Sequence, residues 1–278
     1  MIKEFLTYQK EIKGLAIQTL QGYEKELAAF VKYASKRHMS WSKITKQDID
    51  DYTAHMARYG LKPRTIRKRI EVLRLIFTWA QHEGLLDSNP AQFAQTPKAA
   101  DEIPNVPEMA KIEAYLNKPA KNAEDWLVKA IASFIIETGM RIGELCGMKR
   151  TDIDREHGTI KVHGKGNRER TVYYGKRVAA FIAALNLNIA TQLFPIDQEQ
   201  IRWMMYRQMS PEVGRCNPHA LRHAFACEQL NKGMDTKTLA TLMGHKHEET
   251  TEIYARLRLS RIEQIYKQLN ILNNGKQA

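Results

Sequence analysis

Hydrophobic residues recur at spacings of three and four through roughly the first hundred positions, which is the period of an amphipathic helix. One stripe runs from Leu15 to Tyr33 and predicts a helix that ends near Arg37. The polar stretch Ser40 to Thr45 breaks this pattern, Asp48 is expected to start the next helix, and Tyr59-Gly60 would end it. The expected buried face of this second helix comprises Ile49, Tyr52 and Met56. No convincing strand pattern occurs in this region, so we expect it to be helical.

The densest basic run in the chain, residues 62 to 69, leads into an apolar periodic segment that continues to Trp79. Proline is favoured in the first turn of a helix, so a helix beginning near Pro63 would turn the apolar residues inward and the basic ones, including Arg74, outward. Taken alone, the run is more typical of a solvated helix face, but it also suits contact with a DNA backbone. The candidate DNA contacts are Lys62, Arg64, Arg67, Lys68, Arg69 and, in a later hairpin, Arg168.

Turn residues end the helical region at Leu85 to Pro90, and three prolines lie between Gln95 and Glu108. We interpret residues 95–107 as an interdomain linker that could pass along a DNA duplex. The sequence therefore predicts a helical domain over residues 1–94 and a second domain over residues 108–278.

The second domain begins with two expected helices, Pro107 to Leu116 and Ala123 to Thr138. After a turn at Thr138-Gly139-Met140, helical spacing resumes at Arg141. Alternating residues from Gly158 to Tyr174 predict an antiparallel hairpin whose tip is Gly164 to Asn167. The fold class expected from these patterns is mainly α with a small antiparallel sheet.

Later elements of this domain are again helical. Residues 198 to 209 show helical spacing, and Pro218 suits the first turn of a helix that carries residues 219 to 223. Asp235 could cap a further helix that Gly244 ends. The last stretch, Tyr254 to Leu272, is amphipathic; it could contact a neighbouring protomer or pack on its own domain.

Composition adds a strong basic bias, with 43 Lys and Arg against 31 Asp and Glu and a formal charge of +12 over 278 residues. This charge indicates a polyanionic partner, of which nucleic acid fits best, although a basic solvated surface has the same composition. The three cysteines, Cys146, Cys216 and Cys227, form no paired motif. The N-terminus has charges too early for a signal peptide, and the most apolar run, Leu127 to Ile136, is too short to span a bilayer. We therefore expect a soluble, cytoplasmic protein.

The residues with candidate chemistry are concentrated in the second domain. Arg141 and Glu144 are three apart and share a helix face, so the carboxylate can orient the guanidinium. His219 and Arg222 have the same spacing, and His245 and Tyr254 follow. Together they supply phosphate donors, permanent cations and a phenol that can act as a nucleophile. Zinc is disfavoured because the Glu of an HExxH motif is missing and arginine would repel a cation.

Six motifs occur in one order: TGMRIGEL at 138–145, GKGNRER at 164–170, LFP at 193–195, NPHALRH at 217–223, LMGH at 242–245 and TTEIYA at 250–255. In these motifs the chain resembles the tyrosine recombinases of the phage integrase family, and it is similar in organisation to the short Xer-like members without an arm-binding domain. The basic region after Pro63 resembles the family's helical, SAM-like core-binding domain.

This resemblance implies a function and a set of catalytic residues. Tyr254 would attack the scissile phosphate of duplex DNA and form a 3′-phosphotyrosyl link, without metal, nucleotide or other cofactor. Arg141 and Arg222 would hold non-bridging oxygens, Lys165 would protonate the leaving 5′-oxygen, and Glu144 would orient the cluster. His219 and His245 would donate hydrogen bonds to the phosphate or assist proton transfer.

The resemblance also implies partners: double-stranded DNA with paired half-sites, and a homo-tetramer that exchanges strands through a Holliday junction. In solution the protein would be a monomer or weak oligomer, and accessory proteins could take part. The outcome could be integration, excision, inversion or resolution of DNA. Two alternatives stay open at this point: a DNA-binding or architectural protein that does not cut, and a monomeric enzyme similar to a type IB topoisomerase.

Overall fold

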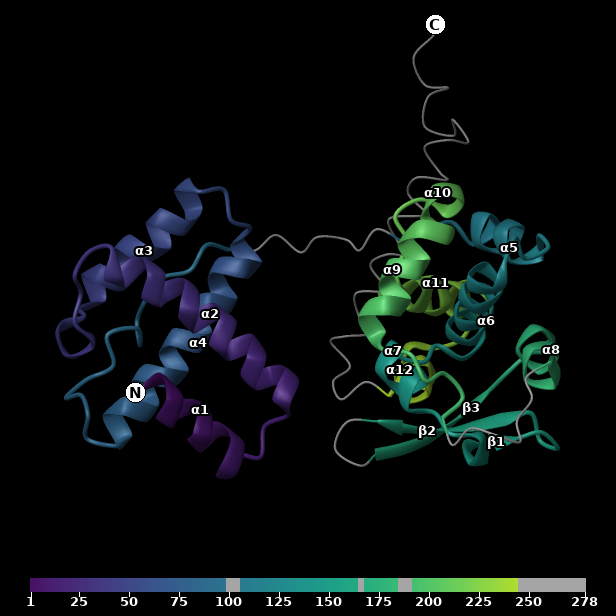
Figure 1. Ribbon diagram of the computed structural model, residues 1–278, viewed down its shortest axis with the longest axis horizontal. Coiled ribbons are helices and arrows are strands. Elements are labelled where there is room, and N and C mark those ends of the chain that lie inside the picture. Colours follow the sequence, from purple (N-terminus) through teal and green to yellow (C-terminus); the bar gives the residue numbers. More distant parts are fainter. Residues whose placement is uncertain (99–105, 165–167, 185–191, 245–278) are drawn as a thin grey trace, which may run out of the picture. The chain divides into compact units, whose positions relative to one another are not determined.

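The computed structural model describes residues 1–98, 106–164, 168–184 and 192–244. The chain forms two compact units, Met1–Glu102 and Ile103–Ala278. The first is helical, and the second combines helices with a three-stranded antiparallel sheet (Figure 1). The predicted fold class is confirmed. Lys165, His245, Tyr254 and the expected last helix lie outside the described residues.

The described helices of the first unit pack around one apolar core. They are α1 (Ile2–Glu11), α2 (Ile17–Ser35), α3 (Lys46–Arg58) and α4 (Pro63–His82), with the short 3-10 helix η1 (Trp41–Lys43). Ile49, Tyr52 and Met56 of α3 are buried, as their spacing predicts. The prediction that Asp48 starts this helix was wrong. Thr45 is the N-cap, and its amide donates to the Asp48 carboxylate at 2.8 Å, which forms a capping box.

Helix α4 begins at Pro63, within the predicted basic run, and turns most of its apolar residues into the core, whereas Leu75 is 42% exposed. Arg74 departs from the expected outward orientation. Its Nε donates to the carbonyl of Ala91 at 3.0 Å and its Nη2 to the carbonyl of Ala94 at 2.5 Å. This arginine therefore fixes the segment that follows α4 against the helix, because both acceptors belong to that segment.

The second unit is built around α6 (Ala123–Thr138), which is buried on nearly every side and contacts α8, α9 and α11. Its described helices are α5 (Met109–Asn117), α6, α7 (Ile142–Gly147), α8 (Lys176–Ala184), α9 (Gln198–Gln208), α10 (Ser210–Val213), α11 (Pro218–Asn231), α12 (Thr236–Met243) and the 3-10 helix η2 (Arg150–Asp152). Helix α6 ends at Gly139, whose φ of 67° lies in the left-handed region that favours glycine. Among the described residues, no helix combines the length and apolar character needed to cross a membrane.

Lys129, which interrupts the apolar run of α6, has a structural role. Its side chain is buried, and its ammonium group donates to the carbonyls of Tyr115 and Lys118 at the end of α5. It also lies over the Tyr115 ring, 4.1 Å from the centroid. A cation at a helix C-terminus satisfies carbonyls that have no partner within the helix. The lysine thus connects α6 to α5.

The sheet has the order β1 (Ile153–Asp154), β2 (Thr159–Gly164) and β3 (Arg168–Tyr173). Strands β2 and β3 form the predicted hairpin, whereas β1 and α8 were not predicted. The inner face carries Ile160, Val162 and Val172, all buried, so Thr171 and Tyr173 belong to the outer face. Because side chains alternate along a strand, Arg170 shares the inner face with Val172. Helix α7 contacts β2, and α12 contacts β3 (Figure 1).

Candidate active site

Arg141 occupies the N-cap position of α7, two residues after the glycine that ends α6. Its Nη1 donates to Glu144 Oε1 at 3.0 Å, and its backbone amide donates to Glu144 Oε2 at 2.7 Å. The predicted pairing of these two residues is therefore present. The side chain of Arg141 is 39% exposed whereas that of Glu144 is 6% exposed, so the cation faces solvent and its partner is buried.

Arg170 joins the same cluster from β3, and the sequence analysis assigned it no role. Its Nη1 and Nη2 donate to the two carboxylate oxygens of Glu144 at 2.8 and 2.7 Å. Burial would raise the pKa of Glu144, but hydrogen bonds and charge from Arg170, with a smaller contribution from Arg141, outweigh it and lower the pKa. Glu144 is therefore ionised at neutral pH and shared between two arginines.

Arg222 lies on α11 with only 3% of its surface exposed. Asn217 caps the helix by accepting a hydrogen bond from the amide of Ala220 at 2.9 Å. The guanidinium of Arg222 donates to the carbonyl of Gly139 and, at 2.6 Å, to the carbonyl of Met243. Arg222 thus connects the end of α6 with the end of α12.

The last three carbonyls at the end of α12 each accept a hydrogen bond from a different arginine. Leu242 accepts from Arg170 Nε at 2.8 Å, Met243 from Arg222 at 2.6 Å, and Gly244 from Arg141 Nη2 at 3.0 Å. We call these residues, 242 to 244, the α12 carbonyl end. Carbonyls at a helix C-terminus carry partial negative charge, so the three cations have a favourable acceptor there. Three guanidinium groups therefore surround the residues that immediately precede His245.

The histidines of α11 lie beside this cluster. The rings of His219 and His223 stack with centroids 6.1 Å apart. Desolvation lowers the pKa of His219, and the charges of Arg222 and Arg141 lower it further. The pKa of His223 falls to about 4, mainly through burial. Both rings are therefore neutral at pH 7. Within the described part of the chain, no three His, Cys, Asp or Glu side chains are grouped to hold a metal ion.

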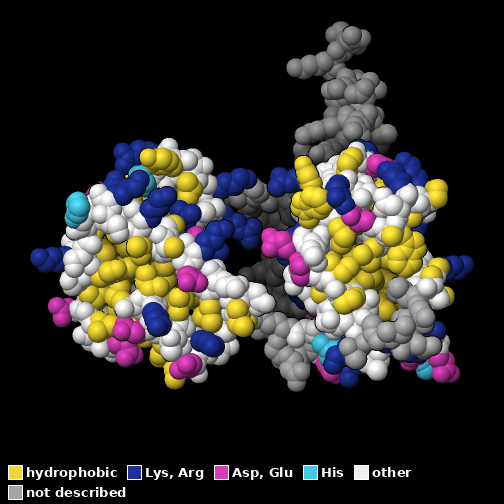
Figure 2. All heavy atoms as spheres, in the orientation of Figure 1, with side chains coloured by type: hydrophobic (Ala, Val, Ile, Leu, Met, Phe, Trp, Pro, Cys, Tyr) yellow, Lys and Arg dark blue, Asp and Glu magenta, His cyan; other side chains and the backbone are white. Residues whose placement is uncertain are grey.

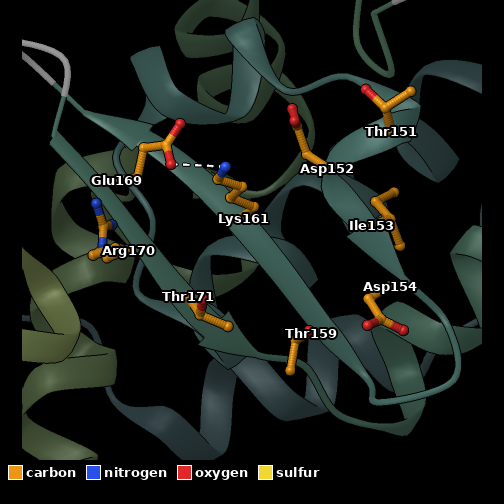
Figure 3. A pocket seen from close by; sticks show the side chains of 9 residues that line it. All are labelled: Thr151, Asp152, Ile153, Asp154, Thr159, Lys161, Glu169, Arg170 and Thr171. Carbon is orange, nitrogen blue, oxygen red and sulfur yellow. Dashed lines mark ion pairs between the residues drawn. The ribbon is translucent and has the colours of Figure 1, made fainter.

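Arg170 was not predicted as a site residue, because its position along the chain places it on no shared helix face with the other candidates. Register could have revealed it, since Val172 and the cross-strand partner Val162 identify the inner face and place the arginine there. Figure 3 shows the contrast within β3: Glu169 turns toward Lys161 on β2, whereas the side chain of Arg170 points away from that pair. Lys161 and Glu169 pair at 2.7 Å on the outer face.

The candidate DNA contacts of the first unit divide into two groups. Arg64 and Arg67 are exposed. Lys68 and Arg69 pair with the buried carboxylate of Glu26, at 2.9 and 3.0 Å, and Lys68 keeps 57% of its side chain exposed. Lys62, which is exposed, lies just before α4; the remaining candidate, Arg168, belongs to the second unit, where it begins β3. Figure 2 shows Lys and Arg side chains on both units, interspersed with acidic ones.

Two models of known protein families match this chain, one in each unit. The model of the phage integrase family matches residues 107–261, which contain α7, β3, α11 and α12. The chain belongs to the phage integrase family. A second model, the N-terminal SAM-like domain of phage integrases, matches residues 2–84, which contain α1 to α4.

Members of this family are similar to the chain over nearly its whole length. The tyrosine recombinase XerD of Halalkalibacterium halodurans is 27% identical, in an alignment that covers 95% of each chain. XerD of Yersinia pestis is 28% identical, in an alignment that covers 96% of each chain.

Two solved structures share the fold. The Tn1549 transposon integrase in complex with transposon right end DNA has a TM-score of 0.74 at 21% identity, covering 94% of this chain and 99% of that one. The XerH site-specific recombinase bound to palindromic difH has a TM-score of 0.74 at 18% identity, covering 98% and 85%.

Proposed function

We propose that this chain is a site-specific tyrosine recombinase that cuts and rejoins duplex DNA with Tyr254 as the nucleophile. The observation that carries the proposal is the convergence of Arg141 and Arg222 on adjacent main-chain oxygens, those of Gly244 and Met243. Two permanent positive charges therefore lie at one place, next in sequence to His245. A phosphate offers the same kind of acceptor oxygen with a full negative charge, and guanidinium groups bind it well.

In the proposed reaction the phenolic oxygen of Tyr254 attacks the scissile phosphorus, and the bond from phosphorus to the 5′-oxygen breaks. The products are a 3′-phosphotyrosyl link and a free 5′-hydroxyl. In the rejoining step, this hydroxyl attacks the phosphotyrosyl link of a partner strand and releases the tyrosine. Arg141 and Arg222 stabilise the charge that accumulates on the non-bridging oxygens. Lys165 protonates the leaving oxygen.

His219 and His245 are proposed to donate hydrogen bonds to the phosphate or to assist proton transfer from the phenol. For His219 the lowered pKa supports this role, because a ring that is neutral at pH 7 keeps one nitrogen to donate and one to accept. Glu144 orients Arg141 through its hydrogen bonds to the guanidinium and the backbone amide. The reaction as proposed needs no cofactor.

The assembly is proposed to be four protomers on two DNA sites, each with paired half-sites, and strand exchange through a Holliday junction. The palindromic difH substrate of XerH supports paired half-sites, since a palindrome presents the same sequence to two copies of a protein. Exposed Arg64 and Arg67 of α4 are proposed to contact the DNA backbone. We place the activity in the cytoplasm, and the free thiols of Cys146 and Cys216 support this location.

The test is covalent trapping on nicked suicide substrates, prepared from random genomic fragments because the target site is to be found. The wild-type protein should form a covalent adduct on the 3′ side of the nick, and Tyr254→Phe should form none. Tyr206→Phe is the matched control, because Tyr206 is an exposed tyrosine of α9 at a distance in sequence from the proposed site.

Three results would contradict parts of this proposal. Tight and site-specific DNA binding without any adduct from the wild-type protein would indicate a binding protein. Adducts that persist in Tyr254→Phe would assign the nucleophile to another residue. Relaxation of supercoiled DNA at arbitrary sequence by a monomer would indicate topoisomerase-like action in place of recombination.

A further inference from the structure

We propose that Arg170 is a positioning residue for DNA cleavage, which holds Glu144 and the end of α12 so that Arg141 is aimed at the scissile phosphate. This inference rests on the proposed function and deepens it. Arg170 itself would not contact the phosphate. Its side chain is 13% exposed, and Nε, Nη1 and Nη2 each donate to a protein acceptor.

Glu144 depends on Arg170 for its orientation. A carboxylate at the end of a glutamate side chain rotates freely unless both oxygens are held, and a guanidinium fork holds both in one plane. Here Oε1 accepts from Arg170 at 2.8 Å and from the Arg141 side chain at 3.0 Å. Oε2 accepts from Arg170 at 2.7 Å and from the Arg141 amide at 2.7 Å. The bidentate contact from Arg170 therefore sets the plane in which Glu144 meets Arg141.

The second acceptor of Arg141 also lies against Arg170. The guanidinium of Arg141 donates to the carbonyl of Gly244, and Gly244 packs directly on the Arg170 side chain. A Cβ atom at Gly244 would lie 3.0 Å from Arg170 Nη1 and 3.3 Å from its Cδ. Arg170 also bonds Leu242, two residues earlier, at 2.8 Å. Arg170 therefore bonds the Glu144 carboxylate and packs beside Gly244, the two residues whose oxygens accept from Arg141.

Removing this side chain should affect the rate of cleavage more than DNA binding. Arg141 would keep its charge, so the attraction to DNA would persist, but its 39% exposed guanidinium would lose the fixed frame around it. A misplacement of about 1 Å in a catalytic group can reduce a rate about 100-fold. We expect Arg170→Gln to lower the rate constant of adduct formation by about 10- to 100-fold.

The experiment is trapping with the suicide substrate in saturating excess over the protein, so that each active protein molecule reacts once; the rate constant and the amplitude are measured separately. A protein that is merely less stable has fewer active molecules, which lowers the amplitude and leaves the rate constant unchanged. A misplaced Arg141 lowers the rate constant. DNA affinity, measured by anisotropy on the same site, should equal that of the wild type. Arg207→Gln is the matched control, because it breaks another two-nitrogen Arg–Glu pair, with Glu124, on α9.

A double substitution tests whether Arg170 acts through Glu144. In a Glu144→Gln background, Arg170→Gln should cost much less than it does alone, since the shared carboxylate is already gone. Arg170→Lys should recover only part of the rate, because one ammonium group cannot bind two carboxylate oxygens and the Leu242 carbonyl with the same geometry.

The outcomes separate this inference from the proposed function. If the wild-type protein forms an adduct and Arg170→Gln keeps the same rate constant, the positioning role is wrong and the recombinase proposal stands. A fall in DNA affinity with an unchanged rate constant would make Arg170 a DNA contact, which also refutes the role. If the wild-type protein forms no adduct, both proposals fail.

Discussion

Gly139, which ends α6 and accepts a hydrogen bond from Arg222, should be one of the least replaceable residues of the second unit. Its φ of 67° costs an alanine about 1–2 kcal/mol. The added Cβ would also lie 2.5 Å from Cε1 and 2.6 Å from Cδ1 of Phe225, a ring that is 2% exposed. Overpacking a buried site costs about 1–3 kcal/mol. We therefore expect Gly139→Ala to destabilise the second unit by about 2–5 kcal/mol in total.

Gly158→Ala separates the two contributions. Gly158 has a φ of 63°, but a Cβ there meets nothing within 4 Å, so this variant carries the backbone strain without the clash. Urea unfolding followed by hydrogen exchange and mass spectrometry reports peptides of α6 and α11 separately, and peptides of the first unit serve as an internal reference. The reasoning fails if both variants lose the same stability, because Phe225 would then move aside at no cost.

Two further predictions concern pH and DNA contact. Because the folded pKa of His223 is about 4 against an ordinary 6.5, the unfolded chain binds a proton first, so the second unit should lose stability as pH falls from 6.5 toward 4. His223→Gln should remove this part of the pH dependence in urea titrations, and an unchanged slope between pH 6.5 and 5 would refute it. Arg67→Gln should weaken DNA binding and reduce the salt slope by about 1 without altering stability. Arg69→Gln should instead destabilise the first unit, because it leaves the buried Glu26 with one cation fewer; equal salt slopes for the two variants would contradict the distinction.

The sequence predicted elements well where periodicity and capping residues agree. The bounds of α6 match the expected Ala123 to Thr138, α11 has Pro218 in its first turn, and Asp235 caps the helix that follows it. Two elements escaped prediction: β1 is only two residues long, and α8 follows Gly175 and not a Ser, Thr, Asp or Asn that would signal a helix start. Those elements are determined by contacts with α6 and β2, which no local pattern encodes.

Only the contacts between near neighbours of the candidate site could be predicted from the sequence. Arg141 and Glu144 are neighbours along one helix turn, so spacing alone pairs them. The contacts of Arg170 with Glu144 and of Arg222 with Gly139 join residues 26 and 83 positions apart. Such contacts depend on how β3 and α11 pack against α7 and α6, and charge patterns along the chain do not reveal them. Arg74 was assigned to the surface for this reason, because its acceptors lie beyond the end of its own helix.

The three arginines of the site also depend on one another, because all of them bind the α12 carbonyl end. Helix α12 has only eight residues, too few to be stable without tertiary contacts. We therefore expect it to open cooperatively with the arginine side chains that bind its C-terminal carbonyls. Arg141, Arg170 and Arg222 all bond this one helix end. One local opening of this helix end would therefore remove one hydrogen bond from each of the three arginines at the same time. Warming the protein should therefore lower the fraction of molecules that can cleave DNA, and should leave the rate constant of the molecules that are still intact little changed.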